Sequence, residues 1–160
     1  MSFFLPVDGE VECLDFYQPG GYHPVVLDDN INNRYCIAHK LGYGGYSVVW
    51  LAWDRELKQY VALKIARARA SEHLRREAAA LRTFRVEDVP TVLDEFDIEG
   101  PNGRHACFTM TMAAGDLAAA KYGYVFPTDV ARALSAKVAT IVHHLHNNSW
   151  CHGGASHRIG

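Results

Sequence analysis

Five stretches of the chain have the hydrophobic pattern of β-strands. In the first, Tyr35, Ile37 and Leu41 alternate with more polar or smaller residues, and the others are rich in β-branched and aromatic residues. An Asn102-Gly103 pair separates the last two stretches, and this dipeptide is a strong hairpin signal. We expect strands over 35–42, 47–53, 60–65, 91–98 and 105–112.

The apolar spacing changes to that of a helix after residue 70. Leu74, Ala78 and Leu81 recur at i, i+4 and i+7, which places them on one side of an amphipathic helix. Ser71 is suited to cap the start of this helix, and Glu72 lies favourably in its first turn.

A second, longer helix is predicted after Pro127, beginning at Thr128 or Asp129. Its apolar stripe consists of Val130, Leu134, Val138, Ile141 and Leu145. The predicted order is therefore three strands, a helix, two strands, a loop and a long helix, which indicates an α+β fold. Residues 1–33 hold many turn formers and no sustained periodicity, so we expect an extended arm that packs on another part of the protein and is not itself a core.

The composition is that of a globular protein with no excess charge. The 160 residues suit a single domain, and 49% are hydrophobic against 21% charged. The net charge of −2 is too balanced to favour a nucleic-acid or membrane surface. The four cysteines form no CxxC pair, which argues against a zinc ribbon and for reduced thiols. With no secretory signal and no long apolar stretch, we expect an intracellular protein of the cytoplasm or nucleus.

A glycine-rich segment between the first two predicted strands has the pattern G-x-G-x-x-S-x-V, formed by Gly42, Gly44, Ser47 and Val49. Glycines let the backbone approach phosphates closely and adopt positive φ without a Cβ clash. A plain hairpin turn explains the pattern equally well when it is taken alone. A dinucleotide-binding fingerprint needs a helix after the glycines, and a Walker-A loop needs a Gly-Lys-Ser/Thr ending. The strand–turn–strand context instead favours the phosphate-covering loop of protein kinases.

The third predicted strand carries the sequence V-A-L-K, which ends at Lys64 and is close to the kinase V-A-I-K element. Alternation places Lys64 on the strand face that it shares with Ala62. Glu77 lies on the same side of the predicted helix as the apolar stripe, so it is the expected partner of the lysine. Glu72 falls elsewhere on that helix and is read as a solvated charge. A solvated strand lysine is the alternative for Lys64.

Together these motifs resemble the small lobe of eukaryotic protein kinases, and more narrowly the SR-protein kinases of fungal type. The narrower resemblance rests on the stretches YQPGGYHPV (17–25), NRY (33–35), KLG (40–42), VPTVLDEF (89–96) and EGPNG (99–103). It implies a small lobe over 34–112, with a five-stranded antiparallel sheet and one helix, after an N-terminal extension over 1–33. It further implies the hinge and first long helix of the large lobe over 113–154, with a divergent tail over 155–160.

The resemblance implies ATP-dependent phosphorylation of serine or threonine in Arg-Ser-rich proteins, with Mg²⁺ as in the family. It places adenine between Leu41, Val49 and Ala62, with Met110 as gatekeeper. The residues it implies for ATP binding are Leu41, Gly42, Tyr43, Gly44, Gly45, Tyr46, Ser47, Val49, Ala62, Lys64, Met110, Thr111 and Met112, with Glu77 pairing the lysine. Met110 and Met112 are equally explained as core residues. Nothing indicates the oligomeric state.

The resemblance to the kinase catalytic loop breaks after His152-Gly153. The family has an aspartate next, whereas this chain has Gly154, which has no side chain to accept a substrate proton. The Asn and Asp-Phe-Gly that hold Mg²⁺ in kinases are also absent, so we expect this chain alone to be inactive. A frame change, a mis-spliced exon or a pseudogene would explain a kinase truncated at this loop.

Two other interpretations bear on the chain. One is a zinc-binding site, because imidazole and thiolate ligands cluster at His143, His144, His146, Cys151, His152 and His157. Neighbouring histidines on one helix point in different directions, so solvated histidines at the helix end explain this cluster better. The other is a non-catalytic, pseudokinase-like module that retains nucleotide or partner binding.

Overall fold

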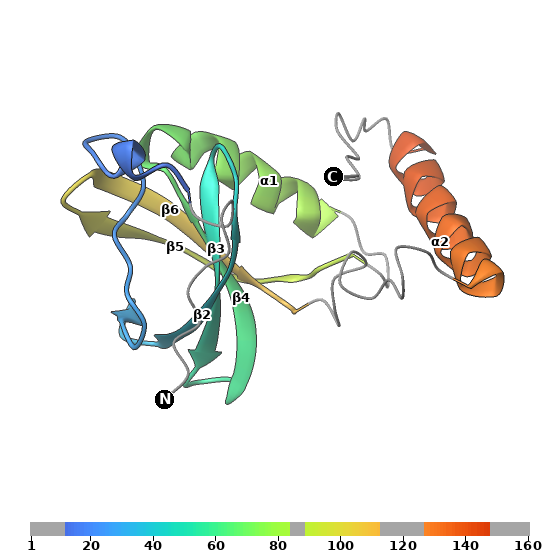
Figure 1. The fold of residues 1–160 in the computed structure, drawn as a ribbon, viewed down its shortest axis with the longest axis horizontal. Coiled ribbons are helices and arrows are strands. Elements are labelled where there is room, and N and C mark those ends of the chain that lie inside the picture. Colours follow the sequence, from blue (N-terminus) through green and yellow to red (C-terminus); the bar gives the residue numbers. More distant parts are fainter. Residues whose placement is uncertain (1–11, 84–88, 113–126, 148–160) are drawn as a thin grey trace. The chain divides into compact units, whose positions relative to one another are not determined.

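The computed structural model describes residues 12–83, 89–112 and 127–147 (Figure 1). These residues divide into two units, one made of 12–83 with 89–112 and the other of 127–147. The first unit contains the sheet and the shorter helix. The second contains the helix α2 (Thr128–Asn147). It begins at Thr128, which is one of the two predicted start residues.

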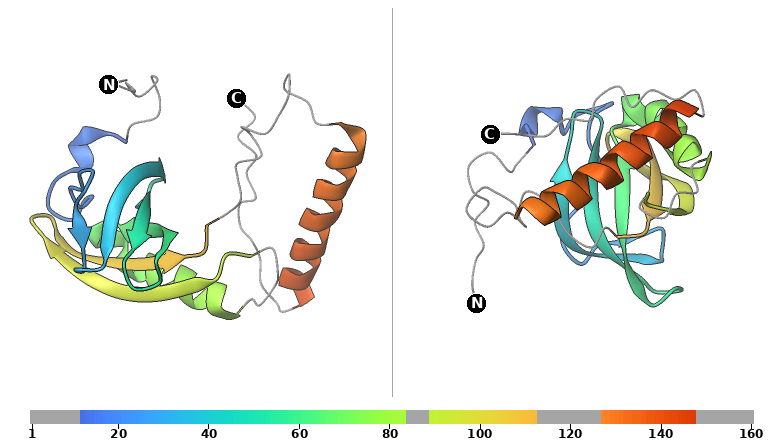
Figure 2. Two further views of the ribbon diagram at one scale, coloured as in Figure 1. Left: turned by 90° about the horizontal axis from the view of Figure 1, so that it is seen from below. Right: turned by 90° about the vertical axis from the view of Figure 1, so that its right-hand side faces the viewer.

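Six strands form one antiparallel sheet in the order β1-β2-β3-β4-β6-β5. They are β1 (Asn30–Ile31), β2 (Tyr35–Tyr43), β3 (Ser47–Asp54), β4 (Gln59–Ala66), β5 (Val92–Gly100) and β6 (Gly103–Met110). The five predicted strands are present, and the two-residue strand β1 adds a sixth that the sequence did not indicate. The sheet is visibly curved (Figure 2). Because β4 lies between β3 and β6, side chains on β4 have neighbours from both sides.

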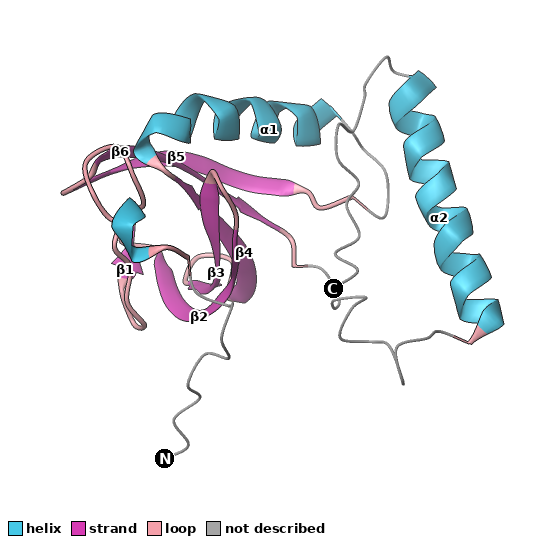
Figure 3. Cartoon of the chain, turned by 45° about the horizontal axis from the view of Figure 1, so that its top comes forward, coloured by secondary structure: helices cyan, strands magenta, loops and turns pink. Residues whose placement is uncertain are grey.

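The helix α1 (Ser71–Thr83) follows the short 3₁₀ helix η2 (Ala68–Ala70) and runs across one face of the sheet (Figures 1 and 3). Its predicted stripe faces the sheet, because Leu74 and Ala78 are buried and Leu81 packs against the same cluster. A leucine side chain that leaves water, such as Leu74, contributes about 1.5–3 kcal/mol to folding, and the smaller Ala78 contributes less. The amphipathic pattern therefore docks this helix on the sheet.

Ser71 has a different role from the predicted helix cap. It is the first residue of α1, and its hydroxyl donates to the carbonyl of Arg104 at 3.2 Å and accepts from the N–H of Ala106 at 3.0 Å. The hydroxyl thus joins the start of the helix to β6. The cap prediction is wrong because a strand distant in sequence offers partners that local spacing does not reveal.

Both faces of the sheet are packed, and β4 shows this most clearly. Val61, Leu63 and Ile65 lie in one core cluster, whereas Ala66 lies in the cluster beneath α1. Side chains of a strand alternate between its two faces, so β4 contributes to both clusters. Lys64 is the half-buried exception in this buried stretch of the strand.

Residues 12–33 pack on the sheet, as expected of an arm that packs on another part of the protein, but they also contribute to the core, which was not expected. It includes the 3₁₀ helix η1 (Leu14–Phe16) and the strand β1, which pairs with β2. Tyr22 is 3% exposed and belongs to the main core cluster together with Ile31. Tyr22 and Ile31 thus lie in the main core cluster, although the sequence around them is rich in turn formers.

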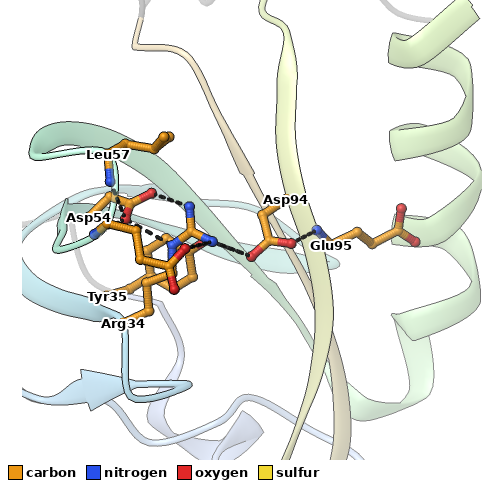
Figure 4. A network of polar contacts seen from close by, with 7 residues as sticks. Arg34, Tyr35, Asp54, Leu57, Asp94 and Glu95 are labelled. Carbon is orange, nitrogen blue, oxygen red and sulfur yellow. Dashed lines mark hydrogen bonds and ion pairs between the residues drawn. The ribbon is translucent and has the colours of Figure 1, made fainter.

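A polar network ties the start of β2 to the β3–β4 turn and to β5 (Figure 4). Arg34 Nε and Nη2 donate to the two carboxylate oxygens of the fully buried Asp54 at 2.8 and 2.7 Å. Arg34 Nη1 lies 2.8 Å from a carboxylate oxygen of Glu56, and the Tyr35 hydroxyl donates to Asp94 at 2.6 Å. The Arg34 hydrogen bonds lower the pKa of the Asp54 carboxyl.

Candidate nucleotide-binding site

The strand register brings the predicted side chains of three strands onto one face of the sheet. Lys64 pairs directly with Val49 of β3 and with Phe108 of β6, and Ala62 pairs with Met110. Directly paired residues, and residues two apart on one strand, project to the same face. The predicted adenine-lining residues Val49 and Ala62 and the predicted gatekeeper Met110 therefore lie around the lysine on the face that α1 partly covers.

Lys64 forms the ion pair that the helix spacing predicts. Its Nζ donates to Oε1 of Glu77 at 2.6 Å, and the two side chains are 18% and 36% exposed. The same Nζ lies 5.9 Å from the centre of the Phe108 ring. Partial burial limits the net stability that such a pair provides, because desolvation offsets much of the Coulomb gain. Its main effect is to hold the ammonium group in one place.

Glu72 is turned away from this pair. It lies at the exposed start of α1, where its Oε1 accepts from Arg76 Nε at 3.3 Å. An i,i+4 pair of this kind on a helix surface contributes about 0.3–0.5 kcal/mol. The assignment of Glu77 as the inward carboxylate and Glu72 as a surface charge matches the structure.

The predicted phosphate loop is the turn between β2 and β3, closed by a hydrogen bond from the Gly44 N–H to the Ser47 carbonyl at 2.9 Å. A Cβ built on Gly42, Gly44 or Gly45 would meet no atom within 4 Å. Among the described glycines only Gly20 and Gly103 have positive φ, so the turn does not use the left-handed region. Of the two properties that glycine brings to such a loop, this turn does not use positive φ, and the open space at its glycines leaves room for the close approach of a ligand.

The other residues of the turn differ in exposure. Leu41 and Tyr46 are 46% and 61% exposed, and the Tyr46 ring lies 4.7 Å from the ring of His73 on α1. Tyr43 is half-buried, and Lys40 Nζ lies 5.4 Å from its ring. Ser47 is 6% exposed. Leu41 and Tyr46 are therefore accessible to a ligand, whereas Ser47 lies in the packed base of the turn.

The hinge predicted after β6 is only partly described. The Thr111 N–H donates to the carbonyl of Thr91 at 3.0 Å, and the Thr91 N–H donates to the Thr111 hydroxyl at 3.0 Å. An adenine contact from Thr111 would thus use its carbonyl. Met112 is 41% exposed, whereas Met110 packs against the cluster beneath α1. Met110 consequently has a core contact, in line with the core alternative for this residue.

Several predicted residues fall outside the described ranges. These are Ala113 of the hinge, Cys151, His152, His157 and the position of the missing aspartate, Gly154. Within 12–83, 89–112 and 127–147 no three His, Cys, Asp or Glu side chains are grouped so that they could hold a metal ion. No helix in these ranges is long and apolar enough to cross a membrane.

The structure also reveals two site-supporting residues that the sequence patterns did not single out. Tyr22 and Arg67 hydrogen-bond to the backbone of the glycine turn from outside it. Tyr22 was visible only as part of the YQPGGYHPV stretch, and Arg67 only as one of several basic residues after β4. Neither shows a periodicity that would indicate a contact with residues 44–46.

The arrangement of sheet, single helix and lysine–glutamate pair is that of a protein kinase small lobe. Among solved structures, one described as "PpkA-294 apo form" is similar, with a TM-score of 0.69 over 84% of this chain and 56% of that chain. The sequence identity is 16%, so this likeness concerns the fold. No protein-family model matches the chain.

The sequence comparisons point to a particular family among the protein kinases. The chain is 36% identical to SRSF protein kinase 3 of Homo sapiens in an alignment 120 residues long that covers 69% of this chain and 21% of that protein. It is 38% identical over 122 residues to serine/threonine-protein kinase spk-1 of Caenorhabditis elegans, covering 69% of this chain and 12% of spk-1. It is 33% identical over 151 residues to protein kinase dsk1 of Schizosaccharomyces pombe, covering 84% and 27%.

The chain belongs to the SRPK family of protein kinases, as its sequence motifs suggest. It spans between 12% and 27% of the length of these three relatives. Kinases of this family use ATP and Mg²⁺ in general.

Proposed function

We propose that this chain binds ATP on the face of the sheet that carries Lys64, beneath the β2–β3 turn. The observation that carries the proposal is the 2.6 Å ion pair between Lys64 and Glu77 on the same sheet face as Val49 and Ala62. The lysine supplies a positive charge for the α- and β-phosphates, and Glu77 holds it in position. Val49, Ala62 and Leu41 offer apolar contacts to adenine.

The contribution of Lys64 gives the proposal a quantitative test. A charge-assisted hydrogen bond is worth about 1.5–3 kcal/mol, so Lys64→Ala should weaken ATP binding by roughly 10- to 100-fold. Titration calorimetry of the whole chain with ATP measures this change. Lys58→Ala removes an exposed lysine from the β3–β4 turn and serves as the matched control, with no change expected. Equal affinities of Lys64→Ala and the natural chain, with folding intact, would contradict the proposed site.

The reaction of the whole protein is a further part of the proposal. We infer that it transfers the γ-phosphoryl group of ATP to serine or threonine of Arg-Ser-rich proteins. The support is its family membership and the name of one relative, SRSF protein kinase 3. Mg²⁺ is expected to accompany ATP in that reaction.

For the 160-residue chain by itself we favour nucleotide binding without phosphoryl transfer. Gly154 occupies the position at which the family has its catalytic aspartate, and a hydrogen atom cannot accept the hydroxyl proton of the substrate. We expect no transfer of labelled phosphate from ATP to an Arg-Ser peptide above the background of the Lys64→Ala variant. Turnover by the natural chain that this variant abolishes would contradict the non-catalytic interpretation.

A further inference from the structure

The glycine turn is held through its carbonyl groups by two side chains from outside the predicted site. The Tyr22 hydroxyl donates to the Gly44 carbonyl at 2.7 Å. Arg67 Nη1 donates to the Gly45 carbonyl at 3.1 Å, and the Arg67 backbone N–H donates to the Tyr46 carbonyl at 2.8 Å. Three consecutive carbonyls of the turn thus have partners in the segment around Tyr22 and at the end of β4.

Tyr22 and Arg67 are themselves held in place. Tyr22 is 3% exposed, and its carbonyl accepts from Asn102 Nδ2 of the β5–β6 hairpin at 2.6 Å. The Arg67 guanidinium lies 4.2 Å from the centre of the Phe16 ring and 5.2 Å from that of Tyr22, within cation–π range. Burial raises the pKa of the Tyr22 hydroxyl, so it stays protonated and able to donate.

Backbone hydrogen bonds also join this segment to the 3₁₀ helix η2, which directly precedes α1. The N–H groups of Ala68 and Arg69 donate to the carbonyls of Gly21 and Gly20 at 2.9 and 3.0 Å. Figure 1 shows the N-terminal segment at the end of the sheet where α1 begins. Residues 16–22 are therefore joined by hydrogen bonds and ring contacts to the elements on both sides of the glycine turn.

Such a support matters because the turn has few contacts of its own. Positions 42, 44 and 45 have open space where a side chain would lie, and Gly44, Gly45 and Tyr46 are all exposed. Glycine has the largest conformational freedom of any residue, so an unsupported turn would lose much entropy when it closed on a ligand. Hydrogen bonds made before binding reduce that cost to ligand affinity.

We propose that the N-terminal segment, acting through the Tyr22 hydroxyl and Arg67, is a positioning element that orders the glycine turn for the phosphates of ATP. This inference rests on the proposed function. It assigns to residues 16–22 a part in nucleotide affinity, although they lie outside the segment that forms the site. Tyr22 is a positioning residue here, because it acts on the ligand only through the turn.

The variant Tyr22→Phe removes the hydroxyl and keeps the buried ring. Loss of one neutral hydrogen bond should weaken ATP binding by about two- to tenfold, while adenosine, which has no phosphate, keeps its affinity. Calorimetry with both ligands measures this difference. In the nucleotide-free chain, hydrogen exchange of the Gly44 amide should become faster. Tyr60→Phe, at an exposed tyrosine of β4, is the matched control and should change none of these quantities.

Three results would overturn the inference. One is an unchanged affinity for ATP in Tyr22→Phe. Another is an equal loss of affinity for ATP and adenosine, which would indicate general damage to the fold. The third is unchanged amide exchange at Gly44. If the natural chain binds no nucleotide, the proposed function fails, and the exchange measurement still decides whether Tyr22 orders the turn.

Discussion

Replacement of Asp54 by alanine is the most direct test of the polar network in Figure 4. Both oxygens of this fully buried carboxylate accept from Arg34, and Oδ1 also accepts from the N–H groups of Glu56 and Leu57 at 2.9 and 3.1 Å. Removal of one partner of a buried ion pair costs about 3–5 kcal/mol of unfolding free energy. Arg34 is 20% exposed and keeps Glu56 and Asp94 nearby. We therefore expect a loss near the lower limit, about 3 kcal/mol.

The same carboxylate predicts a pH dependence with a definite sign. The pKa of Asp54 is lowered in the folded state, mainly by the hydrogen bonds from Arg34. The unfolded chain, with an ordinary aspartate pKa of about 3.9, binds the proton first as the pH falls. The stabilisation is therefore complete above that pH and is lost as the pH falls through the folded-state value. Asp54→Asn should flatten this loss below about pH 4.

Urea unfolding of the whole chain, followed by tryptophan fluorescence, measures both effects. Trp50 and Trp53 lie on β3, the strand that ends at Asp54, so they report on the sheet. Glu56→Ala is the control, because this side chain is 68% exposed and its ion pair should contribute at most about 1 kcal/mol. A loss below about 1 kcal/mol for Asp54→Ala would refute the reasoning that this network stabilises the sheet.

Other positions give sharper contrasts between stability and binding. Gly44→Ala should leave the urea midpoint unchanged and weaken ATP binding, because its Cβ would occupy open space where phosphate must approach. Gly21→Ala should instead destabilise the fold, because a Cβ there would overlap a backbone carbonyl. Glu77→Gln should lower ATP affinity at nearly constant stability in calorimetry and urea unfolding, since the ion pair is partly exposed. Burial beside His105 lowers the pKa of His23, so the unfolded chain binds the proton first and stability should fall as the pH drops below about 6.5. His23→Phe should remove that pH dependence, and an unaltered slope would show that another group is responsible.

The strands β2 to β6, both α-helices and the lysine–glutamate pair could be predicted because their signals are local. Alternation over a few residues specifies a strand, and the positions of Leu74 and Ala78 specify which side of α1 faces the sheet. Once that side is known, Glu77 must point inward and Glu72 outward. The prediction of Lys64 as the partner needed only the alternation of β4 and the order of the elements.

Residues with no repeating pattern around them could not be placed in this way. Tyr22 lies in a stretch of turn formers, and its contact with Gly44 joins positions 22 residues apart. Ser71 has the composition of a cap, yet its hydroxyl binds β6, 33 and 35 residues further along the chain. Contacts between residues so far apart in the sequence depend on how whole elements pack against one another.

The sequence by itself determined the five longer strands, the two α-helices and the inward side of α1, because these follow from short-range periodicity, and its motifs indicated a kinase family. Only the tertiary structure decided that the N-terminal segment supports the glycine turn, that the turn glycines avoid positive φ, and that Asp54 is fully buried beneath Arg34. The physical reason is that hydrogen bonding and burial at these positions depend on strand register and on contacts between distant segments. These contacts and this burial are formed only when the strands have paired in register and the core has packed.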